Sequence, residues 1–155
     1  MEKTNVMRLL EQKKIPYETR FLENAESLTG VEIALKLEEN PKQSFKTLVT
    51  EGKTKNHYVF VIPVDASLDL KKAAKIVSEK SIDMIKQKEL LPLTGYVHGG
   101  CSPIGMKKSF VTVIDESAKD FEEIYFSAGK IGCQVKVRVE DISKLIRVSF
   151  ADLKE

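Results

Sequence analysis

The sequence is poor in several residue types that mark particular protein classes. It has no tryptophan, only two cysteines and two histidines, and its 25 Lys and Arg residues against 23 Asp and Glu leave a formal charge of only +2. Two cysteines are too few for the disulfide framework of a small secreted domain. So small a net charge does not predict nucleic-acid binding by the molecule as a whole, and any site for a polyanion must be local.

Long hydrophobic segments are also missing. No uninterrupted apolar run approaches the roughly 20 residues that a membrane helix needs, and residues 1–14, MEKTNVMRLLEQKK, form a charged amphipathic segment without the apolar core of a signal peptide. We therefore expect a cytoplasmic protein with no membrane partner. With 42% hydrophobic residues, the 155-residue chain is long enough for one globular domain over residues 1–155.

Hydrophobic periodicity predicts an α+β fold, because the strands arrive as hairpins interrupted by helices. Thr29 and Glu32 form a capping-box pattern at one helix start, Asp69 can cap another, and Pro92 with Gly95 is expected to end a helix and begin a loop. The predicted helices cover residues 4–13, 30–37, 70–77, about 86–91 and 141–146, and the predicted strands cover residues 17–21, 45–50, 57–63, 109–115, 123–127, 133–139 and 147–153. We expect the mixed β-sheet to curl into a barrel with flanking helices.

The loop GYVHGGCSPIGMKK, residues 95–108, concentrates residues with possible chemistry. The H-x-x-C spacing of His98 and Cys101 suggests a metal, but a structural zinc site usually takes four ligands, and only His57 and Cys133 remain to complete it. Cys133 shares an apolar strand face with alternate valines, which is typical of core. We therefore expect no metal.

The same loop admits other interpretations. Cys101 near lysines could be a nucleophile, although a small residue in a tight turn is favoured because no Cys-His-Asp spacing is recognisable. The loop is not a Walker A motif, because Met106 separates Gly105 from the next lysine. Its glycines could let backbone N–H groups cradle an anion or an oxyanion, with Ser102 adding a hydroxyl, yet an ordinary turn fits equally well.

Two further features could complete a pocket. Lys46 lies in the apolar strand FKTLVT, where it could either guard a sheet edge against aggregation or anchor a phosphate or carbonyl of a ligand. SAGKIG, residues 127–132, is a second turn of small residues. It could face the first loop across a pocket or simply connect two strands.

These segments together resemble a known family. The chain resembles the YbaK/EbsC family of aminoacyl-tRNA deacylases from about residue 4 to 153, through the ordered segments FKTL, VIPVDASLDLKKAAK, TGYVHGGCSPIGMKK and SAGKIG. It is most similar to the bacterial Cys-tRNA(Pro) deacylases. These are related to the editing domain inserted in prolyl-tRNA synthetases. The resemblance implies a trans-editing hydrolase that removes cysteine from mischarged proline tRNA. It implies no cofactor, and a transient complex with prolyl-tRNA synthetase.

The resemblance also implies which residues form the site. Lys46 would position the substrate with Thr47 beside it, and the remaining substrate-binding residues would come from the two loops. These loop residues are Gly99, Gly100, Cys101, Ser102, Pro103 and Gly105 in the first, and Ser127, Ala128 and Gly129 in the second. The family's N-terminal aromatic contact is not assigned, because Tyr17, Phe21 and Leu22 offer competing alignments.

The implied mechanism needs no protein nucleophile. In a lyase-like first step, the thiol of the substrate cysteine would attack its own ester carbonyl. This attack would form a cyclic thioester and expel the tRNA. Cys101 would only line the pocket. Two alternatives stay open: editing of another small aminoacyl group, such as Ala-tRNA(Pro), and a non-catalytic module that binds the tRNA end or a nucleotide. Phosphate contacts are largely independent of sequence, so we expect tRNA selectivity to be borrowed from the partner.

Overall fold

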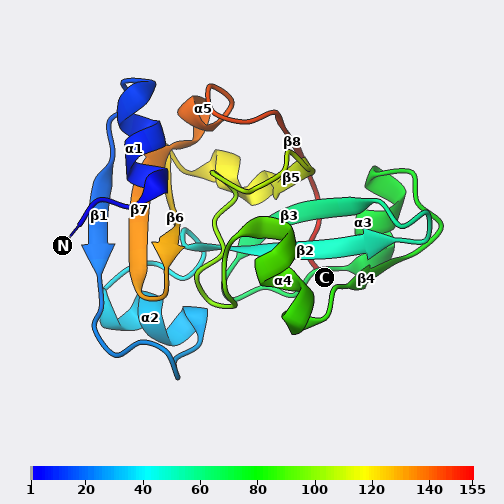
Figure 1. Ribbon diagram of the computed structural model, residues 1–155, viewed down its shortest axis with the longest axis horizontal. Helices are drawn as coiled ribbons and strands as arrows, with labels where there is room; N and C mark the ends of the chain where they lie inside the picture. Colours follow the sequence, from blue (N-terminus) through cyan, green and yellow to red (C-terminus); the bar gives the residue numbers. More distant parts are fainter. Residues whose placement is uncertain (1) are drawn as a thin grey trace.

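The computed structural model describes residues 2–155, which form two β-sheets with helices around them (Figure 1). The smaller sheet is antiparallel and has the order β1 (Glu18–Phe21), β7 (Cys133–Arg138), β6 (Glu123–Lys130). The larger sheet has the order β4 (Ile82–Met84), β2 (Phe45–Gly52), β3 (His57–Pro63), β5 (Val111–Asp115), β8 (Val148–Ala151). It is mixed, because β5 runs parallel to both β3 and β8.

The predicted α+β class is confirmed, but the closed barrel is not. In Figure 1 the strands of the smaller sheet run across the direction of β2 and β3. Outside the two sheets, one isolated parallel bridge, Ser44 with Tyr125, joins the start of β2 to β6. Hydrophobic alternation shows which face of a strand is buried but does not name its pairing partner, and so one curled sheet and two crossed sheets look alike in sequence.

Two helices begin at the side-chain caps that the sequence predicts. Thr29 and Glu32 form the expected capping box, and the Asp69 carboxylate accepts hydrogen bonds from two backbone N–H groups of the next turn. The helices are α1 (Asn5–Gln12), α2 (Gly30–Lys36), α3 (Leu70–Ile76), α4 (Gln87–Thr94) and α5 (Val139–Ile142), with a 3-10 turn at Glu116–Asp120. In the part of the chain described, no helix has the length and apolar character needed to cross a bilayer.

Two local predictions need correction. Pro92 lies inside α4 instead of ending it, and the helix ends at Gly95, whose φ of 87° is the left-handed conformation that glycine adopts without strain. Proline removes one donor and its ring crowds the C=O of Lys88, yet this short helix keeps the bond from Gly95 N–H to Leu91 C=O. The strand β4 was not predicted, because three residues are too few to show alternation.

Strand β3 separates two hydrophobic cores. Val59 and Val61 face the core shared with α1 and the smaller sheet, whereas Phe60 and Ile62 face the core shared with α3. All four side chains are buried. Because both faces of β3 are covered, its sequence is continuously apolar and its position in the middle of the larger sheet is strongly specified.

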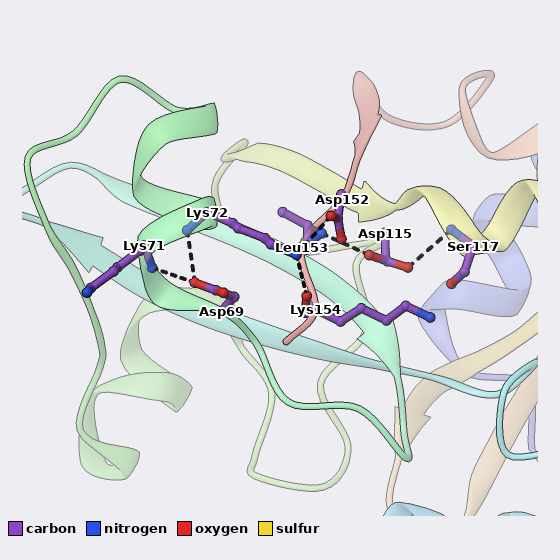
Figure 2. A network of polar contacts seen from close by, with 8 residues as sticks. All are labelled: Asp69, Lys71, Lys72, Asp115, Ser117, Asp152, Leu153 and Lys154. Carbon is purple, nitrogen blue, oxygen red and sulfur yellow. Dashed lines mark hydrogen bonds and ion pairs between the residues drawn. The ribbon is translucent and has the colours of Figure 1, made fainter.

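Asp115 at the end of β5 holds the C-terminal segment in place (Figure 2). Its carboxylate is fully buried and accepts hydrogen bonds from the backbone N–H groups of Leu153, at 2.9 Å, and of Ser117, at 3.1 Å. The Leu153 side chain is buried in the core beneath α3. Close by, Lys72 and Asp152 form an ion pair at 2.8 Å that is largely exposed to solvent.

We predict that Asp115→Ala lowers the free energy of unfolding by about 2–3 kcal/mol, because it leaves a buried N–H group without an acceptor. Urea unfolding measures this loss. Asp152→Ala is the matched control, since it breaks an exposed ion pair in the same network and should change stability much less. Equal effects of the two substitutions would contradict the role assigned to Asp115.

Candidate active site

The site begins as a gap on the outer edge of β2. The Ile85 N–H donates to Val49 C=O on this edge, and Tyr125 N–H of β6 donates to Gln43 C=O further back along the chain. Backbone groups of alternate strand residues point to the same side, so Thr47 directs its N–H and C=O toward this edge, between the two covered ends. Within residues 2–155, β4 pairs with β2 only from Thr50 onward. The backbone near Thr47 therefore remains open.

A cavity of about 690 Å³ occupies this gap. Four segments distant in the sequence form its walls: residues 25–30 before α2, residues 44–49 of β2, the loop around residues 98–101, and the hairpin between β6 and β7. Residues at the start of α4 close one end. The volume lies within the range of sites for small molecules, and the lining combines apolar side chains with a few polar groups.

Lys46 provides a positive charge on the cavity wall. It makes no hydrogen bond or ion pair with the residues described here. Burial lowers the pKa of Lys46, and the Asp65 carboxylate opposes this shift. Because Asp65 is held by the exposed Lys42, at 3.0 Å, the Lys46 ammonium is available to a ligand anion or carbonyl.

Thr47 adds an unused polar side chain. It points to the opposite face of β2 from Lys46, because it lies across from Val61 while Lys46 lies across from Ile62. Its hydroxyl oxygen is buried without a hydrogen-bond partner in residues 2–155. Such a group is rarely left unpaired, and Thr47 is one of the residues that line the cavity.

The loop after α4 contributes fewer lining residues than predicted. Gly99 and Cys101 line the cavity, together with His98. The Ser102 hydroxyl instead accepts a hydrogen bond from Ile104 N–H, at 3.3 Å, and is completely buried. The other predicted loop residues, Gly100, Pro103 and Gly105, are not among the cavity lining.

The hairpin between β6 and β7, which contains SAGKIG, connects these two strands and also packs directly against this loop. A Cβ atom on Gly100 would lie 3.2 Å from the Ile131 nitrogen, so the two backbones come closer than a larger residue would allow. Ser127 lines the cavity, whereas Ala128 is fully buried and Gly129 packs near Tyr96. The two loops thus form adjoining walls of one cavity.

Both cysteines lie at the cavity, and neither has the properties of a nucleophile. Burial raises the pKa of Cys101 to about 12, against a small opposing effect of Thr94. Burial also raises the pKa of Cys133, and Lys130 opposes that shift. His57 lies outside the cavity beside Glu51. Residues 2–155 contain no group of three or more His, Cys, Asp or Glu arranged to hold a metal ion.

Several lining residues could not be identified from sequence. Ser44, Gln134 and residues 25–30 line the cavity, and none of them belongs to a motif that indicates a ligand site. Gln134 faces Ser127 across the β6–β7 pairing, a position that becomes clear only once the strand register is known. The three N-terminal candidates for the family's aromatic contact, Tyr17, Phe21 and Leu22, do not line the cavity.

Comparison with known proteins identifies the family. The chain is 43% identical, over 153 residues, to an Enterococcus faecalis protein named "Putative Cys-tRNA(Pro)/Cys-tRNA(Cys) deacylase EbsC"; the match covers 98% of this chain and 93% of that protein. Residues 24–145 match the model of the aminoacyl-tRNA editing domain. The matched segment includes all four walls of the cavity.

Solved structures show the same fold. A crystal structure described as a "putative trans-editing enzyme for prolyl tRNA synthetase" matches with a TM-score of 0.84 over 99% of both chains, at 23% identity. The "hypothetical protein APE2540" matches with a TM-score of 0.87 over 97% of this chain and 99% of that one, at 20% identity. The sequence matches and the shared fold together show that the chain belongs to the aminoacyl-tRNA editing domain family, within the YbaK/EbsC group that its motifs resemble.

Proposed function

We propose that the protein is a trans-editing deacylase that hydrolyses mischarged Cys-tRNA(Pro). The observation that carries this proposal is the cavity lined by Lys46, whose side chain makes no hydrogen bond or ion pair in residues 2–155, and this cavity is large enough for an aminoacyl group on a terminal nucleotide. The relative that is 43% identical over nearly the whole chain bears the name of a deacylase of cysteinyl-tRNA, which supports the same substrate.

The lining residues suggest how the substrate would bind. Lys46 would hold the ester carbonyl or the nearby phosphate, and the N–H and hydroxyl of Thr47 would contact the aminoacyl group from the open strand edge. Gly99, Cys101 and Ser127 would complete the walls around it. Gly100, Ser102, Pro103, Gly105, Ala128 and Gly129 would keep the two loops in the shape that these contacts require.

The chemistry would come from the substrate. Its thiolate sulfur attacks the ester carbonyl carbon, the bond from that carbon to the ribose oxygen breaks, and the ribose oxygen takes up a proton. Water then opens the resulting cyclic thioester to free cysteine. The enzyme would bend the aminoacyl group toward this attack and stabilise the oxyanion with positioned donors. A thiol ionises near pH 8.5 and a serine hydroxyl does not, so cysteine alone reacts this way.

The nearest alternative is an editor of another small aminoacyl group, such as Ala-tRNA(Pro). A module that binds the tRNA end without catalysis would use the same cavity and would show salt-sensitive binding without loss of the ester. Rates on cysteinyl, alanyl and seryl esters of the same tRNA separate these three possibilities.

We predict that the purified protein releases cysteine from Cys-tRNA(Pro) and that Lys46→Ala slows this release by about 100-fold or more, the usual cost of removing a charge-stabilising group. Single-turnover deacylation of radiolabelled substrate measures the rate. Lys55→Ala is the control, because Lys55 carries the same charge at the far tip of the same hairpin and is 81% exposed. A well-folded protein that leaves saturating Cys-tRNA(Pro) intact would refute the proposal.

The origin of the nucleophile is tested separately. Cys101→Ser should keep most of the activity, because the high pKa of Cys101 leaves its thiol un-ionised at neutral pH. Alkylating the thiol of the substrate should stop turnover while binding persists. The mechanism is wrong if Cys101→Ser is inactive although folded, or if the alkylated substrate is still hydrolysed at the original rate.

We further propose a transient complex with prolyl-tRNA synthetase, which would supply selectivity for proline tRNA. The protein should co-elute with that synthetase when tRNA is present, and the association should weaken as salt is raised. Full selectivity for proline tRNA by the isolated protein, without any such association, would contradict this proposal.

A further inference from the structure

A buried carboxyl group lies behind the wall of the cavity. Glu39 follows α2, its backbone N–H donates to Ala34 C=O at 2.8 Å, and only 6% of the residue is exposed. Both carboxyl oxygens are buried, and neither makes a well-formed hydrogen bond within residues 2–155, although the Gln134 amide favours the charged form of the carboxyl group. A buried carboxyl group without partners is costly and calls for an explanation.

Gln134 connects this carboxyl group with the cavity. The residue is 9% exposed and lines the cavity. It pairs across β1 and β7 with Arg20, whose guanidinium donates to Leu37 C=O at 3.3 Å, two residues before Glu39. Its amide also favours the charged form of Glu39. Its Nε2 atom donates to the Ser44 hydroxyl oxygen at 3.4 Å, and Ser44 also lines the cavity. The Oε1 atom of Gln134 is buried without a partner among the described residues.

Burial outweighs the groups around Glu39 that favour its charged form. Burial raises the pKa of Glu39 to about 7, while the Gln134 amide, Arg20 and Lys136 oppose the rise. Both cations have other contacts: Arg20 lies over the Tyr125 ring, and Lys136 pairs with two carboxylates, Glu18 and Glu123. Glu39 is therefore poised to change charge near neutral pH.

We propose that Glu39 is a positioning residue whose protonation state sets the Gln134 side chain and, through it, the Ser44 hydroxyl on the cavity wall. A neutral carboxyl group can donate its O–H to Gln134 Oε1, which gives partners to two atoms that otherwise lack them and leaves Nε2 bonded to Ser44. A charged carboxylate can only accept, so it draws Nε2 away from Ser44. The role assigned to Gln134 and Ser44 in substrate binding rests on the proposed deacylase function.

The consequence is a substrate affinity that depends on pH. Gln134 and Ser44 on the cavity wall are held in place while Glu39 is neutral. KM for Cys-tRNA(Pro) should therefore rise about threefold to tenfold between pH 6 and pH 8, a change that corresponds to the loss of roughly one hydrogen bond. The substrate thiol acts instead on kcat, which rises toward pH 8.5 as the thiol ionises. Glu39→Gln should keep KM nearly constant over this range, because its amide does not titrate.

Matched variants make the kinetic test specific. Glu38→Gln removes the adjacent exposed carboxylate and should leave the pH dependence of KM as in the wild type. Gln134→Leu breaks the connection on its other side and should also abolish the pH dependence. A wild-type KM that does not change with pH, or a pH dependence that survives in Glu39→Gln, overturns the proposal.

Nuclear magnetic resonance tests the connection without substrate. The side-chain amide signal of Gln134 in ¹⁵N-labelled protein should titrate with a midpoint near pH 7 in the wild type and stay constant in Glu39→Gln. A static Gln134 signal in the wild type also overturns the proposal. If no deacylation occurs at any pH, the proposed function fails, and this titration still decides whether Glu39 controls Gln134.

Unfolding provides the control for stability. Because the folded pKa of Glu39 lies above the ordinary carboxyl value, its contribution to stability is complete below about pH 4.5 and is lost as pH rises toward 7. Wild-type stability should therefore fall over this interval relative to Glu39→Gln. If Glu39→Gln is folded at both pH 6 and pH 8, misfolding is excluded as the cause of an altered KM.

Discussion

The junction between the two sheets determines where the site can form. Tyr125 N–H of β6 donates to Gln43 C=O at 3.1 Å, the Gln43 side chain donates to Glu123 C=O at 2.8 Å, and Ser44 and Tyr125 form a parallel bridge. Two residues beyond this bridge on each strand are Lys46 and Ser127. Both line the cavity, which opens where the strands separate. If the junction were displaced, Lys46 and the loop between β6 and β7 would no longer line the same cavity.

Close approach of backbones sets the other side of the cavity. Gly100 lies against the Ile131 nitrogen, and Gly132, with a φ of 78°, has no room for a Cβ atom because Leu22 C=O would lie 2.4 Å from it. The Gly100 contact brings the two loops together by shape, and the Gly132 contact fits the second loop against the segment after β1. Glycine in these loops therefore serves packing as well as any contact with a ligand, and this explains why several motif residues lie behind the lining.

Local features were predictable from sequence, and features that depend on pairing were not. The hairpin of β2 and β3 and the caps at Thr29 and Asp69 follow from nearby residues, and so the predictions agree with the structure. The two-sheet arrangement and the roles of Ser44 and Gln134 in the lining depend on which strands meet, and one sequence carries no direct signal for that. Lys46 could be singled out because a charge in an apolar strand is unusual, whereas a glutamine in a mixed strand is not.

The properties of the cavity favour discrimination by chemistry over discrimination by size. A space of about 690 Å³ that accepts cysteine also accepts alanine and serine, which are no larger, and a pocket gains little selectivity from one missing or exchanged small group. Burial raises the pKa values of Cys101 and Cys133, so the wall presents neutral thiols beside the Lys46 ammonium. In the proposed reaction the protein binds the ester and the substrate supplies the reactive group, so only a substrate that has its own ionisable thiol reacts. Selectivity for the amino acid then requires no tight pocket, and the open strand edge is free to accept the end of the tRNA.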